Sequence, residues 1–162
     1  MERILIIGCP GSGKSTFARE LHARTNLPLY YLDMLYWNAD RTTVPKEEFR
    51  RRLGEVLEKD SWIIDGNYGS TMALRLAACD TVFFLDYPIE VCLNGILERQ
   101  GKPRPDLPWV EPIGEPDEEF LSMIRSYPQE GRRQVLELRE RYPEKTWMIF
   151  QSRAETDAYF LK

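Results

Sequence analysis

The amino-acid sequence predicts an α/β fold of three layers, in which a five-stranded parallel sheet carries helices on both faces. Three observations predict this fold. Five short and nearly continuous apolar runs are spaced along the 162 residues, as expected of strands buried on both faces. Helical patterns separate these runs, which favours right-handed crossovers between parallel strands. A glycine-rich loop, "GCPGSGKS", joins the first apolar run to the first helical pattern.

Each apolar run has the residue types of a buried strand, because β-branched, aliphatic and aromatic side chains dominate it. The predicted strands are segments 3–8 (RILIIG), 28–33 (PLYYLD), 61–66 (SWIIDG), 81–87 (TVFFLDY) and 146–151 (TWMIFQ). Asp33 ends the second run and Asp65 lies near the end of the third. Because open α/β sheets bind ligands at the carboxyl ends of their strands, both aspartates are candidate site residues.

Three segments between or after the strands have clear helical patterns. Segment 14–25 repeats apolar residues about one turn apart, and segment 45–59 places them at i, i+4, i+7 and i+8 from Phe49. Pro45 suits the first turn of the second of these helices. The stretch "SRAE" at 152–155 has the spacing of a capping box and predicts the start of the C-terminal helix.

Composition and charge narrow the classes of function. Hydrophobic residues make up 43% of the chain and charged residues 30%, so we expect one globular domain over residues 1–162. A net charge of −4 weighs against direct nucleic-acid binding. No apolar stretch approaches the roughly 20 residues of a membrane span, and the N-terminus is unlike a signal peptide.

The three cysteines Cys9, Cys79 and Cys92 are odd in number and lack metal-ligand spacing, which predicts reduced thiols. Reduced thiols are typical of the cytoplasm, so we expect a cytoplasmic protein. For its oligomeric state we expect a monomer or a weak homodimer.

The glycine-rich loop matches the Gly-x-x-x-x-Gly-Lys-Ser pattern of a phosphate-binding P-loop, and a strand precedes it while a helix follows it. Glycines let successive backbone N–H groups turn toward an anion, and the helix N-terminus adds a favourable dipole. Lys14 supplies a charge for the β- and γ-phosphates, and the Ser15 hydroxyl suits Mg²⁺. The residues assigned to nucleotide binding in this loop are Gly8, Gly11, Ser12, Gly13, Lys14, Ser15 and Thr16.

Asp65 is the second candidate metal residue, because an apolar strand that ends in a carboxylate is typical of the Mg²⁺ side of P-loop proteins. Two classes of P-loop protein are excluded by missing features. No asparagine is followed by lysine, so the Asn-Lys-x-Asp guanine reader of GTPases is absent. The chain also lacks the length and the signature motif of an ABC-type ATPase.

The second candidate catalytic group after Lys14 is Asp33, which could orient an acceptor hydroxyl or accept its proton. Tyr36 and Trp37 follow it and are candidates for one wall of an acceptor pocket. The alternative is that these aromatic side chains only fill the core.

A proline-rich segment at about 99–116 interrupts the alternation of strands and helices, with five prolines and the glycines Gly101 and Gly114. Loops of this length in compact domains are usually functional or disordered. Arg99, Lys102 and Arg104 would let the segment close as a lid over a phosphoryl group and exclude water. We assign Arg99 and Arg104 catalytic roles, with a solvated surface loop as the alternative.

Six stretches, "GCPGSGKS", "LDMLYW", "IIDGNY", "FFLDYP", "RQGKPRPD" and "SRAETDAYFL", resemble the adenylate-kinase-like P-loop kinases, in the branch labelled DNA topology modulation protein or FlaR-like. The resemblance covers nearly the whole chain. It implies strand order 2-3-1-4-5, ATP with Mg²⁺, and a mobile lid that carries Arg99 and Arg104. It also implies that Arg153 lies near the adenine and that Arg99 takes part in nucleotide binding.

One departure from that family concerns the acceptor. Nucleoside monophosphate kinases of this type carry Asp-Gly-Phe-Pro-Arg where this chain has the residues 65–69, Asp-Gly-Asn-Tyr-Gly. The arginine that would hold an acceptor phosphate is therefore missing there, and Arg75 on the next helix is the candidate substitute.

These observations predict a phosphotransferase that moves the γ-phosphate of ATP to an unidentified small acceptor. Two alternatives stay open. One is a nucleotide-binding regulatory protein with a role related to DNA topology, and the other is a simple NTPase whose turnover no acceptor stimulates.

Overall fold

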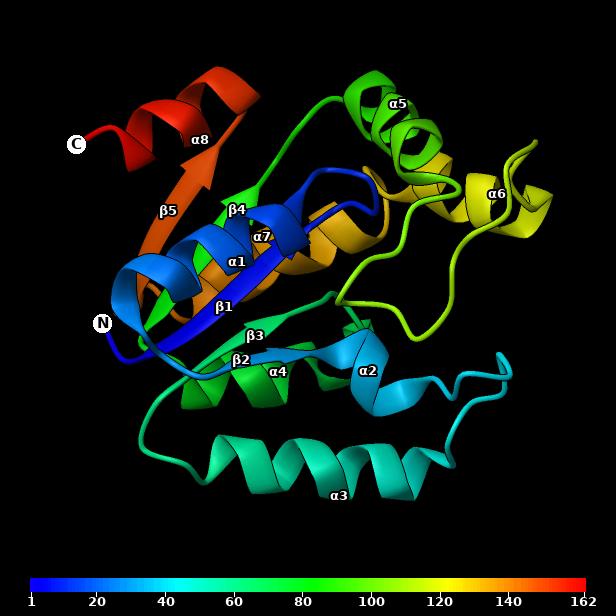
Figure 1. Cartoon of the computed structure of the whole chain (residues 1–162). Helices are drawn as coiled ribbons and strands as arrows, with labels where there is room; N and C mark the ends of the chain where they lie inside the picture. The colour runs from blue at the N-terminus through cyan, green and yellow to red at the C-terminus, as the bar shows by residue number, and fades with distance from the viewer.

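The computed structural model describes residues 1–162 and has one sheet of five parallel strands. The strands are β1 (Arg3–Gly8), β2 (Leu29–Tyr31), β3 (Trp62–Asp65), β4 (Thr81–Leu85) and β5 (Thr146–Phe150). Their order is β2-β3-β1-β4-β5 (Figure 1). The predicted fold class and strand order are therefore confirmed.

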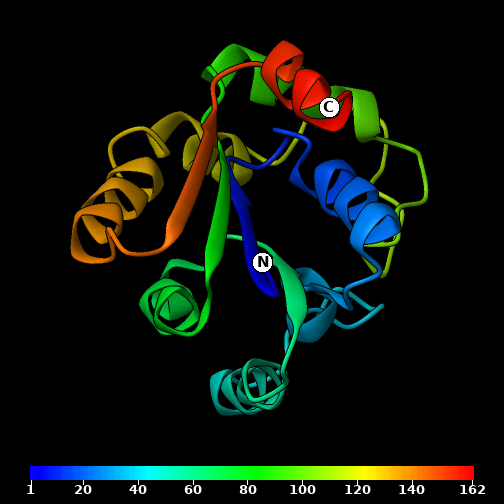
Figure 2. The same cartoon turned by 90° about the vertical axis from the view of Figure 1, so that its left-hand side faces the viewer.

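Helices cover both faces of this sheet (Figure 2). They are α1 (Lys14–Thr25), α2 (Leu32–Tyr36), α3 (Lys46–Leu57), α4 (Gly69–Ala78), α5 (Ile89–Arg99), α6 (Glu118–Ser126), α7 (Gly131–Arg141) and α8 (Arg153–Phe160). Helices α1, α5, α6 and α8 contribute to the core on one face. Helices α3, α4 and α7, with the start of α2, contribute to the core on the other.

The central strand β1 divides its side chains between these two cores. Ile4 and Ile6 pack on the α1 face, whereas Leu5 and Ile7 pack on the α3 face, and all four side chains are fully buried. Burying an aliphatic side chain of this size stabilises the fold by about 1.5–3 kcal/mol. Two-sided burial explains why the strand sequences are apolar without alternation.

The second strand is shorter than the sequence predicts. It ends at Tyr31, and the chain turns at Leu32 into the short helix α2, so Asp33 lies in a helical first turn and not at a strand end. Packing explains the difference, because the Leu32 side chain is fully buried in the α3-face core. It also lies against Gly66, where an added Cβ would meet the Leu32 Cβ at 2.8 Å.

The predicted helices are confirmed, with small shifts at their ends. Segment 14–25 is α1 without change, whereas Pro45 is the N-cap of α3 and not its first helical residue. Ser152 caps α8 and accepts a hydrogen bond from the Glu155 backbone N–H at 3.2 Å. The Glu155 carboxylate accepts from the N–H of Gln151, one residue before the position that a capping box uses.

The proline-rich segment contains no helix or strand between residues 100 and 117, and it connects α5 to α6 (Figure 1). The cysteines Cys9, Cys79 and Cys92 are free and buried. No helix is long and apolar enough to cross a membrane.

Candidate active site

The P-loop connects β1 to α1 and packs tightly on helix α5. Gly11 and Gly13 have φ values of 86° and 91°, a region that side chains disfavour. A Cβ on Gly11 would come within 2.0 Å of the Cys92 carbonyl oxygen, and a Cβ on Gly95 would come within 2.0 Å of the Gly11 carbonyl oxygen. The loop backbone and the α5 backbone therefore lie in direct contact, which fixes the position of the loop.

Asn67, in the loop after β3, holds the start of the P-loop. Its side-chain oxygen accepts from the Gly8 N–H at 3.2 Å, and its amide group donates to the Gly8 carbonyl at 2.5 Å. The next residue, Tyr68, donates its hydroxyl hydrogen to the Asp33 carboxylate. The loop after β3 thus contacts both the P-loop, through Asn67, and the candidate catalytic residue Asp33, through Tyr68.

Arg75 does not substitute for the missing acceptor arginine, contrary to the prediction. Its side chain is fully buried and donates to the carbonyl oxygens of Gly66, Asn67 and Tyr68. Tyr68 has a left-handed backbone with φ 37°, which is unfavourable for a bulky residue unless its surroundings hold it. The guanidinium of Arg75 supplies these contacts, so its charge is used to shape the loop.

Ser15 and Asp65 meet at the end of the P-loop. The Ser15 hydroxyl donates to Asp65 Oδ2 at 2.5 Å, and Asp65 Oδ1 is buried without a hydrogen-bond partner. Burial raises the pKa of the Asp65 carboxyl, while Lys14 and the Ser15 hydrogen bond oppose the rise. Mg²⁺ prefers oxygen ligands, and the unpartnered Oδ1 of Asp65 is available to bind such an ion. The residues therefore fit the predicted metal site.

A polar cleft of about 350 Å³ lies between the P-loop and the proline-rich segment. Its lining contains no hydrophobic residue and includes Gly11, Gly13, Lys14, Ser15, Thr16, Arg19, Arg99, Lys102, Arg104 and Arg153. The structure thus brings Arg99 and Arg104 to the same cleft as Lys14. Such an accumulation of cations around backbone N–H groups suits a polyphosphate.

The two arginines of the proline-rich segment are paired with carboxylates inside it. Arg99 Nε lies 2.9 Å from Glu111 Oε1, and Arg104 Nη2 lies 3.2 Å from the same oxygen. Burial and the neighbouring Arg104 charge lower the pKa of Arg99, while Glu111 raises it. One carboxylate oxygen therefore occupies the point on which both guanidinium groups converge.

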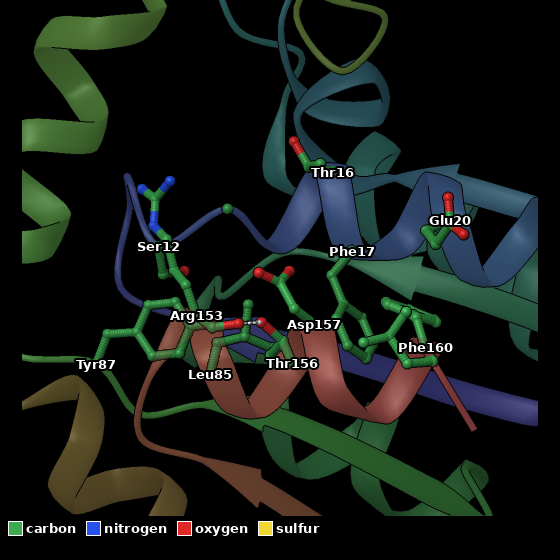
Figure 3. Close-up of a pocket in the computed structure, with 12 residues that line it drawn as sticks. Ser12, Thr16, Phe17, Glu20, Leu85, Tyr87, Arg153, Thr156, Asp157 and Phe160 are labelled. Carbon is green, nitrogen blue, oxygen red and sulfur yellow. Dashed lines mark hydrogen bonds between the residues drawn. The ribbon is translucent and has the colours of Figure 1, made fainter.

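A second, larger cavity of about 560 Å³ adjoins the cleft between α1 and α8 (Figure 3). Thr16, Phe17 and Glu20 line it from α1, and Arg153, Thr156, Asp157 and Phe160 line it from α8. The two cavities share Gly13, Thr16 and Arg153. Arg153 is half-exposed and its guanidinium lies 4.0 Å from Glu98. Ser12 also lines the larger cavity, and its hydroxyl is buried without a partner.

An aromatic cluster includes Tyr68, whose hydroxyl donates to Asp33. Tyr36 contacts Trp37, Phe49 and Tyr68 edge-on, with ring centroids 5.2–5.4 Å apart. Trp109 of the proline-rich segment packs edge-on against Trp37 at 5.4 Å. Tyr36 and Trp37 are therefore partly buried members of a cluster that the proline-rich segment joins.

Three of these residues were missed by sequence reasoning as parts of the site. Asn67 and Glu111 act through contacts with residues 59 and 12 positions away, and Trp109 contacts a ring 72 positions away. No local pattern points to such pairs. The only available signal was the composition of "DGNY" and of the proline-rich segment.

Comparison with curated proteins finds adenylate kinases. Those of Thermotoga neapolitana and Thermotoga maritima are each 30% identical to this chain over 111 residues, which span 63% of this chain and 49% of the relative. The chain thus spans about half the length of the curated relatives it matches. No family model matches the chain.

Comparison with solved structures finds shikimate kinases along almost the whole chain. The enzyme from Bacteroides thetaiotaomicron has a TM-score of 0.59 at 22% identity, covering 99% of this chain and 94% of that one. The Acinetobacter baumannii enzyme, solved in complex with shikimate, has a TM-score of 0.64 at 16% identity, covering 99% and 89%. The structural similarities establish that the chain has the fold of these shikimate kinases.

Proposed function

We propose that this chain is a kinase that uses ATP and Mg²⁺ to phosphorylate a small acceptor. The observation that carries the proposal is the pair of adjoining cavities at the P-loop. One is lined by cations and suits a triphosphate, and the other has apolar rings and suits a nucleoside. The similarity to adenylate kinases and the shikimate kinase fold support a phosphotransferase over a regulatory or purely hydrolytic protein.

On the donor side, the P-loop N–H groups and Lys14 bind the β- and γ-phosphates. Gly13 and Thr16 line both cavities, and Ser12 lines the larger one. Arg153 reaches both cavities, so it can contact either the nucleoside or the phosphates. Ser15 and Asp65 would hold Mg²⁺, which when bound neutralises phosphate charge and aligns the γ-phosphoryl group.

The segment 99–116 acts as the lid in this proposal. Arg99 and Arg104 are held by Glu111 before the nucleotide arrives. Phosphate oxygens then replace the Glu111 carboxylate as partners of the two guanidinium groups, which stabilises the charge that spreads over the transferred group. Closure of this segment also excludes water, which favours transfer over hydrolysis.

Asp33 orients the acceptor hydroxyl and accepts its proton. The hydrogen bond from the Tyr68 hydroxyl holds the Asp33 carboxylate in place. A carboxylate has further lone pairs beyond the one that Tyr68 uses, so an acceptor hydroxyl can still donate to it. Tyr36, Trp37 and Trp109 then supply apolar surface beside the acceptor.

The proposal extends to narrower points that the sequence predicts. Residues 1–162 form one domain, act in the cytoplasm as a monomer or weak homodimer, and belong to the branch labelled DNA topology modulation protein. The net charge of −4 supports a small-molecule acceptor over direct contact with nucleic acid.

The test is ATP consumption with Mg²⁺ against nucleosides, nucleoside monophosphates, shikimate and other small hydroxyl compounds. We expect one class of acceptor to raise turnover well above the rate without acceptor. Lys14→Ala should lower this turnover by about 10²–10³-fold, as removal of one charged transition-state contact does elsewhere.

Asp33→Asn is the matched variant on the acceptor side. We expect it to lose the acceptor-dependent turnover and to keep the affinity for ATP, measured by calorimetry. Binding of ATP with a slow rate that no acceptor changes would contradict the kinase proposal and favour a nucleotide-binding regulatory protein.

A further inference from the structure

Asp106 is a buried carboxylate in the lid that faces the phosphate cleft. It is only 4% exposed, and it lines the cleft together with Lys14 and Ser15. Its Oδ2 lies 3.6 Å from Arg104 Nη1, whereas its Oδ1 is buried and has no hydrogen-bond partner. Half of this carboxylate is therefore buried without a protein group to balance it.

An unbalanced carboxylate is unfavourable at this place for two reasons. Arg104 pairs with Oδ2 only, so the buried Oδ1 is left without a partner, which destabilises the fold. A negative group that faces phosphates also repels them. The other acid that lines the cleft, Glu98, lies near Arg153 and is largely exposed. Asp106 is buried, so water does not solvate its charge. A cation between Asp106 and the phosphates would remove both the cost of burial and the repulsion.

Asp106 shares the cleft with the candidate metal residue Ser15, whose hydroxyl donates to the second candidate, Asp65, at 2.5 Å. Burial raises the pKa of the Asp65 carboxyl most strongly, and the nearby negative charges of Asp106 and Asp33 add to the rise. Asp65 and Asp106 each present one buried, unpartnered carboxylate oxygen, and both Asp106 and Ser15 line the cleft. Ser15 therefore contacts the Asp65 carboxylate directly and shares the cleft with the Asp106 carboxylate.

We infer that Asp106 is a lid-borne carboxylate of the magnesium site, which couples closure of the lid to the presence of the metal–nucleotide complex. The inference rests on the proposed function. It gives a role to Asp106, the acidic residue that follows the basic "KPRP" stretch. The lid arginines alone would bind the nucleotide equally with or without the metal. Nucleotide without Mg²⁺ meets repulsion from Asp106, and nucleotide with Mg²⁺ meets attraction.

A purely structural role for Asp106 makes a different prediction. If Asp106 only positions Arg104, its replacement changes nucleotide affinity by the same factor with and without metal. If it contributes to the metal site, Asp106→Asn weakens binding with Mg²⁺ and strengthens it in EDTA. The ratio of the two dissociation constants therefore separates the roles.

The experiment measures, by calorimetry, binding of a non-hydrolysable ATP analogue in excess Mg²⁺ and in EDTA. We expect Asp106→Asn to reduce the benefit of Mg²⁺ by about 10–100-fold, the range seen when outer-sphere partners of metals are removed. Asp106→Glu should recover part of it. Amide hydrogen exchange of residues 99–116 should show Mg²⁺-dependent protection in the unmodified chain and lose it in Asp106→Asn.

Glu111→Gln is the matched control, because Glu111 is another lid carboxylate but pairs with both arginines. It should shift affinity in Mg²⁺ and in EDTA alike. A Mg²⁺ benefit in folded Asp106→Asn equal to that of the unmodified chain would overturn this inference and leave the kinase proposal standing. If the unmodified chain binds no nucleotide in either buffer, the proposed function fails, and this inference fails with it.

Discussion

The P-loop and the lid segment bring cations to the same cleft but are held in place by different kinds of contact. The P-loop is fixed by its backbone, since Gly11 touches α5 at Gly95 and Asn67 holds Gly8 on both its N–H and its carbonyl. The lid has no helix or strand between residues 100 and 117. Besides one backbone hydrogen bond from Gly101 to Glu111, it is held by side chains, mainly Glu111 with two arginines and Trp109 with Trp37.

The P-loop is thus fixed in position, whereas the contacts of the lid can be exchanged for others. Backbone contacts between strand, loop and helix can be broken only by shifting the whole element. An arginine–carboxylate pair, in contrast, can be replaced one for one by an arginine–phosphate pair of similar geometry. In the proposed function, the P-loop is therefore a preformed anion site, and the phosphates exchange with Glu111 when the lid closes over them.

The largest effect is expected from Gly95→Ala, which breaks the backbone contact of the P-loop. The new Cβ would lie 2.0 Å from the Gly11 carbonyl oxygen, so α5 and the loop must separate. We expect a loss of about 1–3 kcal/mol in the free energy of unfolding and weaker nucleotide binding, measured by urea denaturation and calorimetry.

Gly54→Ala provides the control, because Gly54 is also inside a helix but has nothing within 4 Å of an added Cβ. There the substitution should increase stability by about 0.5–1 kcal/mol through helix propensity alone. Equal effects at Gly54 and Gly95 would show that the loop is not fixed by α5.

A smaller effect is expected from Asp65→Asn. This variant tests whether the buried carboxylate beside the P-loop serves binding and lowers the stability of the nucleotide-free chain. Removing a buried charge with an unpartnered oxygen should raise the stability of the nucleotide-free chain by about 1 kcal/mol, or about 2–4 °C in Tm. The gain in affinity that Mg²⁺ gives the nucleotide should fall at the same time. A lower Tm in this variant would mean that Asp65 is a structural residue.

The smallest effect is expected from Glu111→Gln, which weakens only exchangeable contacts. Stability should change by less than about 1 kcal/mol, because the pair is partly exposed. Affinity for a non-hydrolysable ATP analogue should rise, by up to about tenfold or 1.4 kcal/mol, since both arginines are freed. Unchanged affinity would show that phosphate does not compete with Glu111.

Features that depend on local sequence patterns could be predicted, whereas features that depend on contacts between distant residues could not. The five strands, the P-loop and the N-cap at Ser152 follow from local patterns of apolar residues, glycines and caps, and the structure agrees with them. The end of β2 was predicted two residues too late, because the burial of Leu32 against Gly66 depends on a segment more than thirty residues away.

Part of the site was predictable from motifs, and the charge of the proline-rich segment predicted the two arginines that the structure brings to the cleft, Arg99 and Arg104. Lys14, Ser15 and Asp65 come from such motifs, and the structure brings Ser15 and Asp65 into contact. Arg75 could not be interpreted correctly, because an arginine on a helix looks exposed until the three carbonyl groups it binds are known. Glu111 and Asp106 were missed for the same reason, since their partners are set by how an irregular segment folds back.

The contact between Trp37 and Trp109 has a practical consequence. The two indole rings meet edge-on at 5.4 Å, one directly after α2 and the other on the lid. The other two tryptophans, Trp62 and Trp147, lie in β3 and β5 within the sheet. Separation of the lid from α2 would thus change the fluorescence of one indole pair over a steady background. The chain carries its own optical reporter of closure, so ligand screening by emission needs no label.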